Sequence, residues 1–251
     1  MKPFWIAQNP IVTLDFDGCL GDPFVPKLKL IKDWFGVNAT PEQTRKSGFL
    51  ALMKQLGSKE NYDTFMTRLN EELIMEFEVQ PYCLEMLKKL HTEGYRFAVI
   101  TSREDESKKA MERFLAKHYK GIIDYAHHTN ELSSGKSKAG FVAKLKSRIH
   151  LDDDLYKLEA IAGLPVELFY LRNRGNAHMP LPANYKGRVI EIKDWRQFYQ
   201  EIIRIKLMHE AICKANEWEN KWSNVSKIFK FWKEDEQRAE QLIKQYTKEA
   251  A

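Results

Sequence analysis

The chain of 251 residues has few cysteines, and Cys19, Cys83 and Cys213 lie far apart. Such a sparse, odd number argues against a disulfide framework and favours a reducing compartment. The chain also lacks an apolar run of the roughly 20 residues that a membrane span needs, and its first residues lack the apolar run of a secretory signal. We therefore expect a cytoplasmic protein with no membrane segment.

The chain also lacks a large excess of charge of either sign. The net charge is +5, from 40 basic and 35 acidic residues, and the basic residues are spread along the chain. Nucleic-acid binding usually needs a concentrated basic patch, so a nucleic-acid partner is possible but not favoured. The hydrophobic share of 43% and the length suit one α/β domain with an insertion.

Six short apolar segments have the pattern of buried parallel strands. The first, residues 11–16, leads into an Asp17–Gly18 turn. Segments with a helical period separate the later ones, and this alternation predicts an α/β fold with a Rossmann-like parallel sheet. The other five strands are expected at 96–101, 121–125, 148–151, 166–171 and 189–192. The His127–His128 pair is expected in a surface loop.

Long helical segments divide the chain further. Residues 25–78 show only helical periods and predict a helical cap inserted after the first strand, while 1–24 and 79–204 form the core. Residues 205–251 predict a C-terminal helical extension with an apolar stripe. This stripe either packs on the chain's own core or joins two copies in a homodimer. Its aromatic members are Trp218, Trp222, Phe229 and Trp232.

Polar residues gather where the predicted strands end. Asp15 and Asp17 lie at the end of the first strand, residues 101–103 at the end of the second, and Asp152–Asp154 at the end of the fourth. In a parallel sheet these ends meet at one edge, where ligands gather. Carboxylates crowded there would resist common ionisation unless a cation joined them. Mg²⁺ prefers such oxygen ligands, so we expect a Mg²⁺ site.

Four segments together resemble the motifs of the haloacid dehalogenase superfamily. They occur in the family's order and span roughly residues 9–200. The resemblance implies a phosphatase, a hydrolase of phosphoric monoesters, with a covalent aspartyl-phosphate intermediate. The segments are Asp15-Phe16-Asp17-Gly18, Val99-Ile100-Thr101-Ser102-Arg103, the lysines Lys136 and Lys138, and Leu151-Asp152-Asp153.

The resemblance also implies the role of each motif residue. Asp15 would be the nucleophile that takes the phosphoryl group. Asp17 would protonate the leaving oxygen and then activate water. Thr101 would hydrogen-bond a phosphoryl oxygen, and Lys136 or Lys138 would offset negative charge.

For the metal, the resemblance implies a shell around Mg²⁺ made by Asp15, the backbone carbonyl of Asp17, Asp152 and Asp153. Two assignments stay open, although we favour Lys138 over Lys136 and the pair 152–153 over Asp154. The motif residues also have simpler interpretations. Asp17–Gly18 could be a plain turn, Thr101 and Ser102 a helix cap, and 152–154 a capping run for the next helix.

A helical cap that closes over the site favours a small substrate over a polymer. The cap's opening residues, 35–43, are similar to those of nucleotidase-like members, which implies a nucleoside 5′-monophosphate as substrate. The expected substrate-binding residues are Gly18, Phe24, Ser102 and Arg103, with Phe24 either stacking on a base or packing in the core.

Two other functions remain open at this stage. One is a phosphatase acting on the 3′ end of DNA or RNA. Its nucleic-acid-binding surface would include Arg172, Arg174 and Lys186. The other is a scaffold whose aromatic C-terminal helix binds a protein partner.

Overall fold

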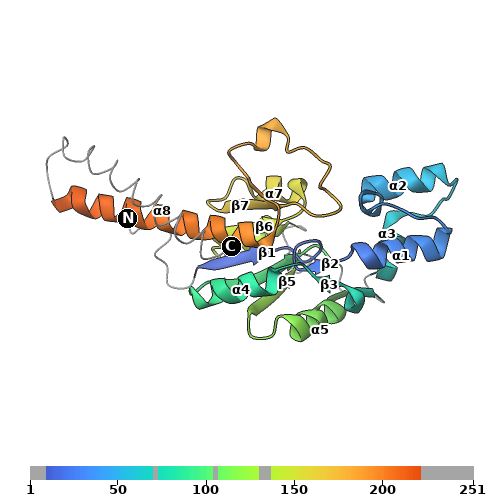
Figure 1. The fold of residues 1–251 in the computed structure, drawn as a ribbon, viewed down its shortest axis with the longest axis horizontal. Coiled ribbons are helices and arrows are strands. Elements are labelled where there is room, and N and C mark those ends of the chain that lie inside the picture. Colours follow the sequence, from blue (N-terminus) through green and yellow to red (C-terminus); the bar gives the residue numbers. More distant parts are fainter. Residues whose placement is uncertain (1–9, 70–72, 104–106, 130–136, 222–251) are drawn as a thin grey trace.

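The computed structural model describes residues 10–69, 73–103, 107–129 and 137–221, with side chains described up to residue 211. Its centre is a six-stranded sheet in the order β5-β4-β1-β6-β7-β8, and every pairing in it is parallel (Figure 1). This confirms the predicted α/β, Rossmann-like fold. The strands are β1 (Ile11–Leu14), β4 (Arg96–Thr101), β5 (Ile123–His128), β6 (Ile149–Asp152), β7 (Glu167–Leu171) and β8 (Ile190–Ile192).

Helices cover both faces of the sheet. On one face, residues of α4 (Cys83–Thr92), α5 (Lys108–His118) and α8 (Trp195–Lys221) form a core cluster with Phe97 and Val99 of β4. On the other, α6 (Lys138–Lys144) and α7 (Leu155–Ile161) pack around Ile100. Because successive side chains of a strand point to opposite faces, β4 contributes to both cores and is buried throughout most of its length.

The segment between β2 (Gly21–Asp22) and β3 (Glu78–Val79) is mostly helical and lies to one side of the sheet (Figure 1). A cluster of aromatic rings, including Trp34, Phe49 and Phe65, holds its helices together. Thr40 and Gln43 form a capping box at the start of its second helix. The helices are α1 (Phe24–Phe35), η1 (Pro41–Thr44), α2 (Lys46–Gln55), α3 (Tyr62–Arg68) and η3 (Ile74–Glu76).

A short antiparallel ribbon joins this helical segment to the sheet. It pairs β2 (Gly21–Asp22) with β3 (Glu78–Val79), so the chain enters and leaves the helical segment side by side. The sequence pattern did not reveal the ribbon, because two-residue strands are too short to show a period of two.

The expectation for His127 and His128 was wrong. Both residues belong to β5, which begins two residues later than expected and runs on to His128, opposite Thr101 of β4. The His128 side chain is fully buried, and its Nδ1 lies 3.2 Å from the backbone oxygen of Arg103.

The last described helix, α8, runs without interruption past residue 204. Asp194 caps its start, since the carboxylate accepts a hydrogen bond from the Gln197 backbone N–H at 2.9 Å. Trp195, Phe198 and Ile202 anchor its first turns in the core. The aromatic residues 222, 229 and 232 of the predicted stripe lie outside the described residues. No helix in the described part of the chain is both long and apolar enough to cross a bilayer.

Candidate active site

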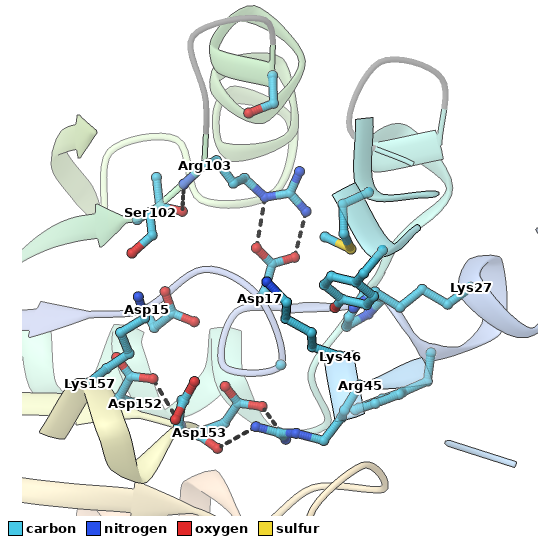
Figure 2. A pocket seen from close by; sticks show the side chains of 18 of the residues that line it. Asp15, Asp17, Lys27, Arg45, Lys46, Ser102, Arg103, Asp152, Asp153 and Lys157 are labelled. Atoms are coloured by element: carbon cyan, nitrogen blue, oxygen red, sulfur yellow. Dashed lines mark hydrogen bonds and ion pairs between the residues drawn. The ribbon is translucent and has the colours of Figure 1, made fainter. Parts of the chain in front are cut away.

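The ends of three neighbouring strands bring acidic side chains together. β1 lies between β4 and β6 in the sheet, so the residues that follow these strands meet at one edge. Asp15 follows β1, Asp152 ends β6, and both carboxylates are almost fully buried. Asp153 lies beside them (Figure 2). The carboxylates predicted to share a site therefore do line one cavity.

Lys138, the first residue of α6, lies between two of these carboxylates. Its Nζ is 2.6 Å from Oδ1 of Asp15 and 2.6 Å from Oδ2 of Asp152. Burial alone would lower the pKa of Lys138, but the two carboxylates outweigh it and hold the pKa above its ordinary value. Lys136, the alternative, lies outside the described residues.

Burial strongly raises the pKa of Asp15. Lys138 opposes this rise, while Asp152, Asp17 and Asp153 add to it. For Asp152, burial also favours the neutral acid, but Lys138 and His150 outweigh it, and the pKa lies below its usual value. The cluster therefore holds more negative charge than one lysine can neutralise, and the pKa of Asp15 is the one that rises.

A series of buried polar side chains contacts Asp152 and one another. His150 Nε2 lies 3.4 Å from Asp152 Oδ2, and His150 Nδ1 lies 2.9 Å from the hydroxyl of Thr13. The Thr13 hydroxyl in turn lies 2.9 Å from that of Ser147. These contacts fix the orientation of a carboxylate that faces the cavity.

Asp17 is paired with an arginine. Arg103 donates from Nε and Nη2 to the two oxygens of Asp17, at 2.7 and 2.5 Å (Figure 2). Burial would raise the pKa of Asp17, but the charge and hydrogen bonds of Arg103 outweigh it, and the pKa falls. The guanidinium also lies over the rings of Phe16 and Phe77, which hold it in place.

Asp153 is held by residues from the helical segment and from the loop after β7. Arg45, between η1 and α2, donates from Nη1 to Asp153 Oδ2 and from Nη2 to its backbone oxygen, both at 3.1 Å. Asn173 donates to the same Oδ2 at 2.7 Å. Arg45 thus links the helical segment directly to the acidic cluster.

Gly18 is a packing residue at the base of this cluster. Its φ of +76° lies in the left-handed region, and a Cβ there would be 2.6 Å from Asp153 Oδ2 and from Asn173 Nδ2. Only glycine lets the loop after β1 approach the loop after β6 this closely.

Gly18→Ala is therefore expected to displace Asp153, destabilise the fold by about 3 kcal/mol and lower phosphatase activity about 10²-fold. Thermal unfolding and a phosphate-release assay measure the two effects. The matched control is Gly36→Ala, because Gly36 has a similar φ of +69° but nothing within 4 Å of a Cβ. An equal loss of stability and activity in both variants would show that close approach at Gly18 is not required.

A cavity of about 940 Å³ opens above the strand ends. The helical segment supplies much of its wall, including Phe24, Lys27 and Tyr62. Phe24 is buried and also packs against Gly175, where a Cβ would lie 2.5 Å from its ring. Phe24 therefore both packs in the core and forms part of the cavity wall.

The donor atoms present fit a hard divalent cation. Ligand atoms of Asp15, Cys19 and Asp153 all lie within 4.8 Å of one another. Burial raises the pKa of the Cys19 thiol well above its usual value, so Cys19 stays protonated and is a poor metal ligand. The carboxylates remain, and their excess negative charge is what a bound cation would neutralise.

The other predicted site residues have distinct positions. Thr101 is buried, lines the cavity, and accepts a hydrogen bond from the Arg103 backbone N–H at 3.2 Å. Ser102 lines the cavity but is exposed. The next described helix, α5, begins at Lys108 with Ser107 as its N-cap, and the amide of residue 105, which Ser102 could cap, lies outside the described residues. Asp154 does act as a cap, since its carboxylate accepts from the Tyr156 N–H that opens α7.

Sequence reasoning missed Lys27, Arg45, Tyr62 and Asn173. Asn173 had a usable signal, because it follows β7 as the other site residues follow their strands. The three residues of the helical segment had none, since a single basic or aromatic residue in a helix does not indicate which face meets the site.

The fold and its acidic strand ends define a haloacid dehalogenase-type phosphatase. A family model for the 5′-nucleotidase, deoxy (pyrimidine), cytosolic type C protein matches residues 9–208. The chain therefore belongs to this nucleotidase family, and it is a hydrolase of phosphoric monoesters. A search of curated proteins found no match.

Solved structures support the fold. A haloacid dehalogenase-like hydrolase from Streptococcus pneumoniae has a TM-score of 0.54 at 15% identity, over 79% of this chain and 98% of that chain. A structure described as a predicted phosphoglycolate phosphatase from Haemophilus somnus has a TM-score of 0.58 at 17% identity, over 78% and 99%. At these identities the likeness concerns the fold alone.

Proposed function

We propose that this chain is a Mg²⁺-dependent phosphomonoesterase that forms an aspartyl-phosphate intermediate on Asp15 and acts on a nucleoside 5′-monophosphate. The observation that carries the proposal is the contact of Lys138 with both Asp15 and Asp152, beneath a cavity that Asp17, Thr101 and Asp153 also line. A buried carboxylate beside a lysine and further acids suits nucleophilic attack on phosphorus.

In the first step, an Asp15 oxygen bonds to the phosphorus and the bond from phosphorus to the leaving oxygen breaks. Asp17 gives its proton to that oxygen. In the second step, Asp17 takes a proton from water, the water oxygen bonds to the phosphorus, and the bond to Asp15 breaks. Free phosphate leaves and Asp15 is restored.

The contacts of Asp17 have a consequence for this cycle. Arg103 favours the ionised form of Asp17, whereas the first step needs the protonated form. The ion pair between Arg103 and Asp17 therefore has to weaken when substrate enters. An anionic phosphate beside Arg103 would compete with Asp17 for its hydrogen bonds.

Asp15, Asp152, Asp153 and the backbone carbonyl of Asp17 would hold the Mg²⁺. When bound, it would neutralise charge on the phosphoryl oxygens. Lys138 favours the ionised form of Asp15 that attacks phosphorus, against the effect of burial, and Thr101 can donate its hydroxyl hydrogen to a phosphoryl oxygen. Asp153 stays oriented through Arg45 and Asn173.

Support for a nucleotide comes from the family and from the cavity. The cavity volume of about 940 Å³ is larger than a small sugar phosphate needs and suits a nucleotide. Phe24, Tyr62 and Met66 supply an aromatic and apolar wall against which a base can lie.

The direct test is phosphate release from a panel of phosphorylated metabolites, with Mg²⁺ and with a chelator. We expect nucleoside 5′-monophosphates to be turned over faster than sugar phosphates, and chelation to lower the rate at least about 10³-fold, since metal charge stabilises the transition state by several kcal/mol. Sugar phosphates that exceed every nucleotide would contradict the substrate, and full activity in chelator would contradict the metal.

A 3′-phosphorylated oligonucleotide belongs in the same panel. Of the basic residues first considered for a nucleic-acid-binding surface, Arg172 is already paired with Glu191 at 2.9 Å and its Nη1 donates to the Asn176 backbone oxygen at 2.9 Å. Arg174 lies 3.9 Å from Asp22. We therefore expect little release from the oligonucleotide.

A further inference from the structure

Lys27 is a buried cation on the cavity wall. It lies near the start of α1, and its side chain extends towards Asp17 (Figure 2). The residue is only 7% exposed, yet among the described residues its ammonium group has no hydrogen-bond or ion-pair partner. A buried charge without a partner costs several kcal/mol in general, so its presence beside a cavity calls for an explanation.

The charges around Lys27 do not compensate it. The carboxylates that raise the pKa of Lys27 are Asp17 and Asp153, and each already has an arginine, Arg103 and Arg45 respectively. Both guanidiniums also act on Lys27 as like charges. The start of a helix adds a further positive potential. Lys27 therefore adds a positive charge to the cavity wall that no carboxylate of the described residues pairs with.

The position of Lys27 indicates which part of a substrate it would meet. The phosphoryl group belongs at Asp15, where Lys138 already offsets charge. Asp17, the proposed acid for the leaving oxygen, is the carboxylate towards which the Lys27 side chain extends (Figure 2), and its charge opposes the lowering of the Lys27 pKa by burial. Lys27 therefore lies on the side of the leaving group, away from the phosphoryl group that is transferred.

We propose that Lys27 binds a second anionic group carried by the leaving group, so that the preferred substrates are phosphomonoesters with a further phosphate or carboxylate. This inference rests on the proposed phosphatase function and narrows its substrate class. Within the nucleotides, it favours a nucleoside 3′,5′-bisphosphate over the 5′-monophosphate.

The test compares kcat and KM, with Mg²⁺, for uridine 5′-monophosphate, uridine 3′,5′-bisphosphate and 2-phosphoglycolate. We expect kcat/KM for at least one doubly anionic substrate to exceed that for the monophosphate by about 30-fold, the usual scale for a desolvated charge pair. Preference for the bisphosphate identifies the second group as phosphate, and preference for 2-phosphoglycolate identifies it as carboxylate.

In Lys27→Met, kcat/KM for the doubly anionic substrate should become about equal to that for the monophosphate, mainly because KM for the doubly anionic substrate rises. Lys27→Arg should keep most of the wild-type preference. Lys32→Met is the matched control, because Lys32 is exposed on the same helix, and it should leave all three substrates unchanged. A wild-type preference for the monophosphate, or an unchanged preference in Lys27→Met, overturns the inference. Absence of turnover with every substrate would instead contradict the proposed function itself.

Stability supplies a second readout. Burial lowers the pKa of Lys27 to about 8, although Asp17 opposes this. Since the unfolded lysine then binds more protons between about pH 8 and 10.5, wild-type stability should rise across this window. Lys27→Met should melt higher than wild type at pH 7, with a difference that narrows as pH rises. A lower melting temperature would show that Lys27 serves as a structural ion pair.

Discussion

Asp15→Asn is expected to lower kcat about 10⁴-fold for every phosphomonoester substrate, the scale seen when a nucleophile is removed. The amide occupies almost the same volume but does not attack phosphorus as a carboxylate does. Phosphate release by the purified variant measures the loss. Full turnover by the variant would show that the aspartyl phosphate does not form on residue 15.

The same substitution should leave the protein folded and make it more stable without metal. Because burial raises the pKa of Asp15 well above its ordinary value, its ionised form costs stability at neutral pH, and the neutral amide removes that cost. Asp33→Asn, at an exposed position of α1, is the control and should change neither property. A variant of residue 15 that melts well below wild type would contradict this account of its environment.

Lys138→Met is the second change with a large expected effect. It leaves Asp15 and Asp152 buried without the ammonium that lies 2.6 Å from each. We expect a loss of about 3 kcal/mol in the free energy of unfolding at pH 7 without metal, and a loss of about 10³-fold in kcat. Chemical denaturation and the phosphate-release assay measure the two.

The pH dependence of that loss has a definite sign. Without Lys138, the pKa values of Asp15 and Asp152 in the folded state should both rise, so the folded variant binds more protons than the wild type as the pH falls. The stability gap between variant and wild type should therefore narrow towards acid pH, and also when Mg²⁺ is added. Lys144→Met, at an exposed position of the same helix, should show neither effect. A gap that stays constant with pH and Mg²⁺ would mean that Lys138 does not neutralise these acids.

The residues that could be predicted from sequence are those tied to a strand. Asp15, Thr101 and Asp152 each stand at the end of an apolar run, and the parallel order of β4, β1 and β6 brings such ends together whatever the details of packing. Lys138 was harder, because its placement depends on where α6 begins, and Ser137 decides this by capping Ala139.

The residues that could not be predicted depend on how the helical segment folds against the sheet. Arg45 lies 108 residues from Asp153 in sequence, and nothing in the pattern of α1 or η1 shows that the side chains of Lys27 and Arg45 turn towards the acids. Contacts of this kind arise from tertiary packing, which local periodicity does not encode.

The error at His127 and His128 has a different cause. Two adjacent polar residues at the end of a run look like a loop, whereas in β5 they continue a strand beside Thr101. Burial of histidine at a strand end is uncommon. Here the backbone oxygen of Arg103 lies within hydrogen-bond distance of His128 Nδ1.

The order of the sheet has a consequence for how the chain is made. β1 is synthesised before both of its neighbours, which begin only at Arg96 and Ile149, after the whole helical segment. The strand that precedes Asp15, the proposed nucleophile, therefore stays unpaired until those later segments have been made. Such distant pairing slows folding and leaves an aggregation-prone edge open meanwhile. Nascent chains cut short before β6 should consequently depend on chaperones to remain in solution.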